Sequence, residues 1–429
     1  MRHQEHERLA SISSIHDKWK EGMCLSSPRS KSDRWFFRWL WNGIFPEEDP
    51  EEDPEEGADR GAGYYASYVI GAQWFDEQEA LIITPKAGCD RIDFLQLFSR
   101  CLQSSSELES FSQIYEIDME APRIKAPELQ SVLSPLIVVH FLSVVREITR
   151  GGLKKDYVCR EENLKKVKGQ IVVLRNDRMN VLRKRPDKVF CRYQEYSVDI
   201  PENRLLKKAL IFVNQILQGF PKNKSRQTLE YVLKHCLSSF AYVSDEIEVW
   251  EIKHLKYQKL FHTYSEAIRL AQMILRRYDY SLTNIQRQDE DCPVFWLDMS
   301  LLYEHYVLGL LREAYGDKVL YQQQGNTGYP DFVCLDSLLV MDAKYIPRLG
   351  KKTKIDSYII RQLSGYARDR KIFEKPPEEP VHCLVIYPEE GQVANPFLER
   401  AIDKLLQTEE EAAWGFHRVA VPLPLLTTE

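Results

Sequence analysis

The apolar positions of the chain follow two periods, which predict a mixture of helices and strands. Apolar residues recur every three to four positions in segments that we expect to be helices, namely Leu136–Thr149, Asn203–Leu217, Ser225–Leu237, Phe261–Tyr278 and Phe295–Tyr315. Short apolar runs predict strands at Ala66–Phe75, Ala80–Thr84 and His382–Tyr387, the first two as a hairpin. The pattern predicts a multidomain α+β protein. We expect a β-rich N-terminal α+β domain, a helical middle region and a C-terminal α/β domain with a mixed sheet flanked by helices.

One predicted helix carries a charged residue on its apolar side. In Phe295–Tyr315, the residues Leu301, Leu308 and Leu311 share one stripe at helical spacing, and Glu304 lies within that stripe. A carboxylate in an apolar stripe is costly unless it is paired or binds a ligand. Glu304 is therefore either an ion-paired structural residue or a ligand.

A second hairpin is predicted near the C-terminal end. The polar pair Asp336-Ser337 separates two apolar runs and suits a tight turn. With this pair as the turn, Leu335 pairs with Leu338, and counting outward brings Asp331 opposite Asp342. Directly opposed residues point to the same face of a hairpin, with Cβ atoms roughly 5 Å apart. The hairpin therefore brings two carboxylates together at its open end.

A lysine joins the two carboxylates. Lys344 follows Asp342 by two positions, and alternate residues of a strand share a face. Two carboxylates this close repel each other unless a cation lies between them, and their hard oxygen atoms suit Mg²⁺. The hairpin predicts a magnesium site at Asp331 and Asp342 beside Lys344. The alternative is an exposed Asp–Lys pair on an ordinary hairpin.

The spacing Pro330-Asp331, ten residues, then Asp342-x-Lys344 resembles the PD-(D/E)xK pattern of metal-dependent nucleases. Cleaving a phosphodiester requires a neutralised phosphate, an activated water and a stabilised leaving oxyanion. One or two Mg²⁺ ions held by the two aspartates, with Glu304 as a further ligand, supply the first and the last. The lysine then positions or helps to deprotonate the water, or offsets charge in the transition state.

A helix is expected to follow this hairpin. Asp356 suits its N-cap, and Ile359, Gln362 and Tyr366 share one face. The amide of Gln362 and the phenol of Tyr366 lie one turn apart. We expect Gln362 to hold Lys344 or the substrate phosphate.

Composition bounds the class of protein. The 429 residues are 44% hydrophobic and 28% charged with a net charge of −6, as in a globular protein without a global basic field. Residues 1–62 contain the aromatic cluster Trp35–Trp41 and the acidic Pro-Glu repeats of Pro46–Gly57, which are unsuited to a core.

The sequence contains no apolar run of about 18 residues, so we expect no membrane-spanning helix. Nine scattered cysteines without a C-x-x-C pair argue against zinc and favour a cytoplasmic protein.

A basic stretch occupies the middle of the chain. Residues 165–192 contain ten Lys or Arg residues and two acidic ones, and Arg183, Lys184, Arg185 and Lys188 form their densest group. Such a stretch is either a solvated face or a contact for a nucleic-acid backbone. Beside a candidate phosphodiesterase, the nucleic-acid contact is the favoured interpretation.

Three sequence segments lie in or just after this region, namely Val167–Ile171, Cys191–Asp199 and Glu202–Lys207, and a fourth, Ile82–Lys86, ends the first hairpin. They resemble the McrC family, the nuclease subunits of modification-dependent restriction systems. The resemblance covers roughly residues 64 to 390. Asn203 and Arg204 stand at a helix start, where we expect them to tie the helix to Tyr193 or Glu195 in a structural role.

The resemblance implies more than the residues show. It implies that Asp331, Asp342 and Lys344 form the nuclease motif, with Gln362 in the following helix, and that the substrate is double-stranded DNA with modified bases of the 5-methylcytosine type. It also implies a partner, an McrB-like AAA+ GTPase ring that reads the base and receives the N-terminal region of this subunit. The sequence has no G-x-x-x-x-G-K-[ST] phosphate loop, so the motor is expected in another chain.

These inferences give a domain plan and three functional hypotheses. The plan is a poorly ordered segment at 1–62, a partner-docking α+β domain at 63–150, a basic helical domain at 151–290 and a PD-(D/E)xK nuclease domain at 291–429. The leading hypothesis is a Mg²⁺-dependent endonuclease subunit of a phage-defence restriction complex. The others are a catalytically silent adaptor of a partner NTPase and a stand-alone repair nuclease.

Overall fold

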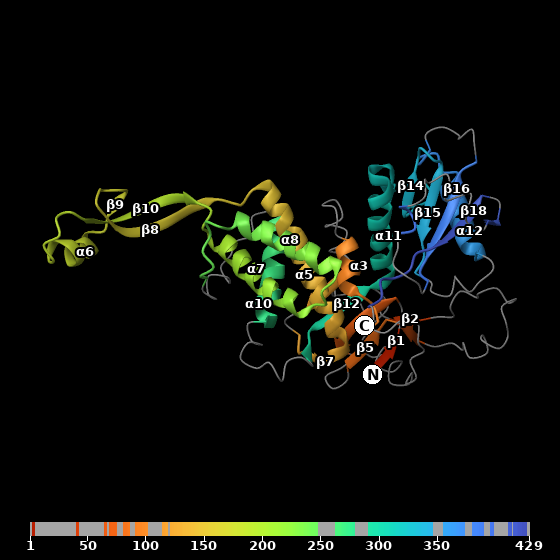
Figure 1. Ribbon diagram of the computed structural model, residues 1–429, viewed down its shortest axis with the longest axis horizontal. Helices are drawn as coiled ribbons and strands as arrows, with labels where there is room; N and C mark the ends of the chain where they lie inside the picture. The colour runs from red at the N-terminus through yellow and green to blue at the C-terminus, as the bar shows by residue number, and fades with distance from the viewer. Residues whose placement is uncertain are drawn as a thin grey trace, which may run out of the picture. The chain divides into compact units, whose positions relative to one another are not determined.

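The structure is a computed structural model, and its fold mixes helices with several sheets, as predicted (Figure 1). It describes residues 2–4, 40–42, 64–66, 68–74, 80–85, 91–101, 114–118, 121–247, 262–278, 291–345, 355–373, 380–389, 395–398, 411–413 and 415–426. The chain divides into two compact units. One comprises Met1–Leu136 together with Ile285–Glu429, and the other is Ile137–Asn284.

A five-stranded sheet in the first unit has the order β1-β5-β4-β12-β6. Its strands are β1 (Arg2–Gln4), β4 (Val69–Trp74), β5 (Ala80–Thr84), β6 (Tyr115–Asp118) and β12 (Val294–Asp298). The antiparallel pairing of β4 with β5 confirms the predicted N-terminal hairpin. Strand β1 pairs with β5 in parallel. Two-stranded sheets join β2 (Leu40–Asn42) to β3 (Tyr64–Ala66) and β7 (Ile124–Lys125) to β11 (Asp291–Cys292).

The segment expected to lie outside the core thus contributes strands. Strand β1 extends the five-stranded sheet, and β2 pairs with β3, so residues 1–62 are not wholly without ordered structure. The prediction missed these strands because each is only three residues long and carries no periodic signal. The acidic repeats and most of the aromatic cluster lie outside the described residues.

The helix predicted at Phe295–Tyr315 begins four residues later, as α11 (Met299–Tyr315). Strand β12 occupies the preceding positions and pairs with β4 and β6, so the expected domain boundary before residue 291 cuts through the first sheet. Asp298 ends the strand and caps the helix, because its Oδ1 accepts hydrogen bonds from the N–H groups of Ser300 and Leu301 at 3.0 and 3.2 Å. Helix α11 is buried from Leu302 to Leu311, which explains why one apolar stripe described it poorly.

A glycine lets α3 (Phe94–Cys101) pack closely on α11. A Cβ at Gly309 would lie 2.2 Å from the carbonyl oxygen of Arg100, which is far inside van der Waals contact. Any side chain at Gly309 would therefore push the two helices apart. This packing fixes the helix that carries Glu304.

The second sheet of this unit is six-stranded and mixed, with the order β13-β14-β15-β16-β18-β17. Its strands are β13 (Leu320–Tyr321), β14 (Phe332–Cys334), β15 (Leu339–Ala343), β16 (His382–Tyr387), β17 (Glu411–Ala413) and β18 (Phe416–Ala420). The central pairs β15–β16 and β16–β18 are parallel, and the outer pairs are antiparallel. The predicted strand His382–Tyr387 is confirmed.

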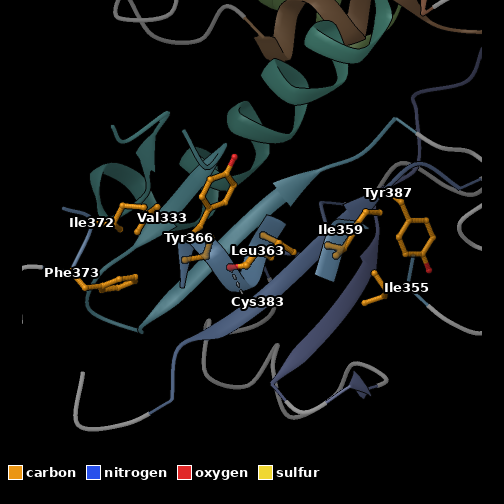
Figure 2. Packing of buried hydrophobic residues seen from close by; sticks show 11 residues of the cluster. Val333, Ile355, Ile359, Leu363, Tyr366, Ile372, Phe373, Cys383 and Tyr387 are labelled. Carbon is orange, nitrogen blue, oxygen red and sulfur yellow. Dashed lines mark hydrogen bonds between the residues drawn. The ribbon is translucent and has the colours of Figure 1, made fainter. Parts of the chain in front are cut away.

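Helix α12 (Ser357–Tyr366) connects β15 to β16 and packs on this sheet (Figure 2). Asp356 stands at its N-cap position, as predicted, although its side chain makes no capping hydrogen bond. Ile359 and Leu363 are fully buried, and the Sγ of Cys383 lies 3.8 Å from the Leu363 carbonyl oxygen. The core between helix and sheet contains Val333, Val340, Ile355, Ile359, Leu363, Tyr366, Ile372, Phe373, Cys383, Val385 and Tyr387.

The second unit holds the three helices predicted for the middle region. They are α7 (Pro201–Gly219), α8 (Lys224–Ser239) and α10 (His262–Tyr278). Helix α5 (Gln130–Gly151) starts six residues before the predicted Leu136, with Pro135 inside it. The stretch Pro127–Gly151 is long and apolar enough to cross a membrane, but 72% of its apolar window is buried inside the protein. Such burial is typical of a core helix.

The basic stretch forms an antiparallel arm that the sequence did not predict. Strands β8 (Asp156–Leu164) and β10 (Val189–Ser197) pair along nine residues. The far end carries β9 (Gln170–Ile171), α6 (Val173–Asn176) and the π-helix η3 (Asp177–Val181), as Figure 1 shows. We call residues 156–197 the arm and residues 165–188 its tip.

Polar contacts fasten the arm to the helices of its own unit. The Nδ2 of Asn203 donates to the carbonyl oxygens of Lys154 and Val198 at 2.9 and 2.7 Å. Arg204 donates two hydrogen bonds to Asp199, at 2.8 and 2.7 Å. The expectation that Asn203 and Arg204 bind Tyr193 or Glu195 is therefore wrong. The chain turns between β10 and α7 and brings other groups closer to both side chains.

Candidate active site

The hairpin of β14 and β15 has the predicted register. Phe332 pairs with Met341, and extending this register by one residue sets Asp331 opposite Asp342. The N–H of Ala343 donates to the Asp331 Oδ2 at 2.8 Å, which holds that carboxylate against the neighbouring strand. The Nζ of Lys344 lies 2.8 Å from the Asp342 Oδ2. The structure therefore brings together the three charged residues that the sequence selected.

Asp342 is buried, and Asp331 and Lys344 are half-buried, so this group is not an exposed surface pair. Asp342 is 1% exposed and the side chain of Lys344 22% exposed. A buried carboxylate without a cation would be strongly disfavoured, and the ammonium group offsets that cost. The alternative of an ordinary solvated Asp–Lys pair does not fit this burial.

Glu304 enters the same site from α11. It is 8% exposed, and the Nε2 of Gln322 donates to its Oε1 at 3.0 Å. The Tyr321 side chain also hydrogen-bonds to it. Its partners are thus an amide and a phenol, and it forms no ion pair within the described part of the chain. Burial, and then the charge of Asp342, raise the pKa of Glu304 above its ordinary value.

The three carboxylates oppose one another's ionisation. Burial raises the pKa of Asp331 well above its usual range, and the charges of Glu304 and Asp342 raise it further. Burial lowers the pKa of Lys344, but the charges of Asp342 and Asp331 outweigh that effect and raise it overall. The site accumulates negative charge that a cation would relieve.

The donor set fits Mg²⁺ with two protein carboxylates. Within the described residues, no group of three or more His, Cys, Asp or Glu side chains is arranged to hold a metal ion. Mg²⁺ rarely needs such a cage, since it usually keeps several waters and binds one or two carboxylates together with substrate phosphates. Asp331, which is half-buried, and Asp342, which is buried opposite it, match this chemistry. Glu304 is held beside them by Tyr321 and Gln322.

Gln362 does not contact Lys344 in the structure. Its Nε2 donates to the Tyr366 hydroxyl at 3.2 Å, along its own helix. The Tyr366 ring in turn packs on Gly328, where an added Cβ would lie 3.1 Å from ring atoms. The structure therefore links Gln362 to the loop that precedes Asp331.

The sequence missed several residues that shape the site. Tyr321 and Gln322 bind Glu304, and the charges of Lys344 and Asp342 both act on the phenol of Tyr358 at the start of α12. Burial, and then the charge of Asp356, raise the pKa of Tyr358 to about 12. Tyr321-Gln322 lies in a polar run without periodicity, so only the tertiary structure could reveal its role.

The tip of the arm carries the predicted basic group. Arg183, Lys184 and Arg185 are exposed, Lys188 is half-buried, and none of the four forms an ion pair within the described residues. Basic residues on the paired strands differ, because Arg192 binds Glu161 at 2.5 Å. The tip also exposes large apolar side chains, namely Val167, Val173, Leu174, Val181 and Leu182, which are 59–77% exposed.

Comparison with known proteins places these features in context. The family model described as "McrBC 5-methylcytosine restriction system component" matches residues 66–362. A search of curated proteins found no match. Among solved structures, the chain is similar to one described as a refined half-complex from the tetradecameric assembly of Thermococcus gammatolerans McrB AAA+ hexamers with bound McrC. That similarity has a TM-score of 0.36 and 16% identity over 99% of this chain and 94% of the other.

A second solved structure, the cryo-EM structure of the Thermococcus gammatolerans McrBC complex, is similar with a TM-score of 0.30 and 14% identity. It covers 72% of this chain and 86% of the other. The family match spans most of the sequence and includes Glu304, the opposed aspartates and Lys344.

Proposed function

Because the chain belongs to the McrBC family of 5-methylcytosine restriction system components, we propose that it is the endonuclease subunit of such a system. In this proposal it hydrolyses phosphodiester bonds of double-stranded DNA that carries modified bases, with Mg²⁺ at a PD-(D/E)xK site. The observation that carries the proposal is the buried Asp342–Lys344 pair with Asp331 held opposite Asp342. A fold that needed only stability would have little reason to bury this charge.

The residues have separate roles in the proposed reaction. Asp331 and Asp342 would hold the cation, and Glu304, which the sequence suggested as a further ligand, is held beside them by Tyr321 and Gln322. When bound, Mg²⁺ supplies charge for the phosphate and the leaving oxyanion. In the metal-free protein, the charges of Asp342 and Asp331 raise the pKa of Lys344. In the proposed reaction Lys344 positions or helps to deprotonate the attacking water, or stabilises negative charge in the transition state.

The proposed partner is an McrB-like AAA+ GTPase. The sequence lacks the phosphate loop that a nucleotide hydrolase of that kind requires, so nucleotide-driven steps fall to another chain. Exposed apolar side chains at the tip of the arm, such as Leu174 and Leu182, favour contact with a protein. Arg183, Lys184, Arg185 and Lys188, which form no ion pair within the part of the chain that the structure describes, are proposed to contact the DNA backbone.

The direct test uses circular DNA, methylated and unmethylated, incubated with Mg²⁺, nucleotide, this protein and an McrB-like AAA+ protein from the same organism. Cleavage of methylated DNA that requires the partner and is lost in Lys344→Ala is the expected result. Lys318→Ala, at an exposed lysine in the same unit, is the matched control. Undiminished cleavage by folded Lys344→Ala would refute the site. Partner hydrolysis stimulated without cleavage or Mg²⁺ binding would identify an adaptor instead.

A further inference from the structure

A loop joins β13 to β14 and delivers Asp331 to the site. We call Gln322–Pro330 the site loop. At its first residue, Gln322, the N–H donates to the Asp331 carbonyl oxygen at 2.9 Å, and the side chain binds Glu304. Gln322 adopts a φ of 45°, a conformation that non-glycine residues rarely take without support from their surroundings. Gln322 therefore ties the first end of the loop to the carboxylate of Glu304 and to the backbone of Asp331.

The middle of the site loop is bound to one buried carboxylate. Asp369, just after α12, is 3% exposed. Its Oδ2 accepts from the N–H of Thr327 at 2.6 Å and from the Thr327 hydroxyl at 2.8 Å, and its Oδ1 accepts from the Nδ2 of Asn326 at 3.0 Å. The N–H of Lys371 donates to Oδ1 at 2.9 Å. Burial alone would raise the pKa of Asp369, but these hydrogen bonds outweigh it and bring the pKa to about 2.

Glycines allow the loop to lie directly on the end of α12. A Cβ at Gly325 would lie 2.7 Å from the Asp369 Oδ2. Gly328 has a φ of 142°, and a Cβ there would lie 3.1 Å from the Tyr366 ring. The N–H of Gly325 donates to the Gly328 carbonyl oxygen at 2.8 Å and closes the turn. The loop thus has little freedom to move without displacing its contacts to Asp369 and Tyr366.

We propose that Asp369 is a positioning residue for the carboxylate site, in which it fixes the site loop so that Gln322 holds Glu304 and Asp331 faces Asp342. The role is indirect, since Asp369 binds the loop and not the reacting groups. The inference rests on the proposed nuclease function.

The test compares Asp369→Asn with Asp317→Asn, an exposed aspartate in the same unit. An amide at position 369 cannot accept hydrogen bonds on both sides, so at least one of the four donors to Asp369, which include the Lys371 N–H, loses its partner. Groups that orient metal ligands typically change affinity or activity by about 10–100-fold when mutated. We therefore expect a loss of about 10-fold or more in the cleavage rate, with the DNA concentration for half-maximal rate unchanged.

Two readouts do not depend on cleavage. Calorimetric titration of the partner-free protein with Ca²⁺ should show weakened binding in Asp369→Asn and unchanged binding in Asp317→Asn. Hydrogen exchange should become faster at the Ala343 N–H, which donates to Asp331 in the structure. A residue that served only stability would lower the melting temperature without changing Ca²⁺ affinity or Ala343 exchange below the transition.

The outcomes separate this inference from the proposed function. If Lys344→Ala abolishes cleavage but folded Asp369→Asn cuts and binds Ca²⁺ like the wild type, Asp369 has no positioning role. If Lys344→Ala cuts at the wild-type rate, the nuclease assignment itself fails. Should Asp369→Asn not fold, Thr327→Val removes only the hydroxyl donor and must show smaller losses in the same three measurements. Wild-type behaviour of Thr327→Val in all three would overturn the inference.

Discussion

Asp331 faces Asp342 across the β14–β15 hairpin, and the Ala343 N–H beside Asp342 holds the Asp331 carboxylate at 2.8 Å. One backbone group thus fixes a carboxylate from the opposite strand next to a like charge. Lys344 compensates Asp342 directly through the ion pair at 2.8 Å. Asp331 forms no ion pair with a lysine among the described residues, so the repulsion between the carboxylates is less compensated at Asp331 than at Asp342.

Removing the charge of Asp331 should stabilise the metal-free protein at neutral pH. Burial, Glu304 and Asp342 raise its pKa in the folded state, whereas in the unfolded chain the pKa is about 3.9. Ionisation therefore costs stability as pH rises above about 4. Asp331→Asn lacks this cost, and its amide oxygen can still accept from Ala343. Urea denaturation in EDTA at pH 5 and 7 should show a larger free energy of unfolding for the variant.

The exposed Asp336 of the same hairpin supplies the matched control, Asp336→Asn, which should leave that free energy unchanged. Equal free energies of unfolding for the wild type and Asp331→Asn at both pH values would show that burying the Asp331 carboxylate near other carboxylates does not destabilise the fold.

Excess Mg²⁺ should make the wild type more stable than Asp331→Asn, which is the reverse of the order expected without metal. A ligand that binds only the folded state stabilises it by RT ln(1 + [L]/Kd), which is about 2.7 kcal/mol at 100 times Kd. The wild type should gain melting temperature with increasing Mg²⁺, and Asp331→Asn and Asp342→Asn should gain far less. Differential scanning calorimetry with 0 and excess Mg²⁺ measures this. If the melting temperature of the wild type did not change with Mg²⁺ or Mn²⁺, the metal site would be refuted.

The local pattern predicted the hairpin register but not its surroundings. The turn at Asp336-Ser337 and strict alternation were enough to oppose Asp331 and Asp342, because both rules act within a dozen residues. Glu304 was recognised because a carboxylate among leucines is costly. The hydrogen bond between Gln322 and Glu304, and the role of Asp369, depend on contacts between segments far apart in sequence. The spacing of apolar residues along the chain does not predict such contacts.

Secondary structure failed where tertiary context overrode local preference. Phe295–Asp298 was predicted to be the first turn of a helix, yet pairing on both edges with β4 and β6 made it part of a strand. The strands of the arm escaped prediction because their outward side chains are charged on both faces, so alternation was hidden. Strands β14, β15 and β16 of the C-terminal sheet were predictable because they are buried and short apolar runs mark them.

The core beneath α12 should govern the stability of the C-terminal sheet. Leu363 is fully buried between helix and sheet, so Leu363→Ala leaves a cavity and should cost about 2–5 kcal/mol. Leu398→Ala removes the same atoms from a side chain that is 56% exposed, and should stay within about 0.5 kcal/mol. Urea denaturation measures both. A small effect at Leu363 would mean that the helix does not pack as described.

Asp369 should make the protein sensitive to acid. Its pKa falls from an ordinary value near 3.9 in the unfolded chain to about 2 in the folded state. A depressed acid pKa contributes stability that is present above the unfolded pKa and lost as pH falls through the folded pKa. The stability difference between the wild type and Asp369→Asn should therefore be constant from pH 7 to 5 and shrink from about pH 4 toward 2. A difference independent of pH would assign the effect to geometry alone.

The basic group at the tip of the arm should contact DNA through its charges. Arg183, Lys184 and Arg185 are exposed and free of ion pairs within the described residues, so each can release counterions from a phosphate. The triple alanine variant should weaken binding to any duplex. It should also flatten the slope of log K against log salt by about 0.9 for each lost phosphate contact.

The matched control removes three exposed lysines of the same unit, in the variant Lys222→Ala/Lys224→Ala/Lys234→Ala. It changes net charge equally and should leave the salt slope intact. Fluorescence anisotropy with a labelled duplex between 50 and 200 mM salt distinguishes the two. If the tip variant binds DNA like the wild type but loses the AAA+ partner, the tip is a protein-docking surface. Its exposed apolar residues Leu174 and Leu182 would then be the anchors, and Leu182→Asp should abolish that association.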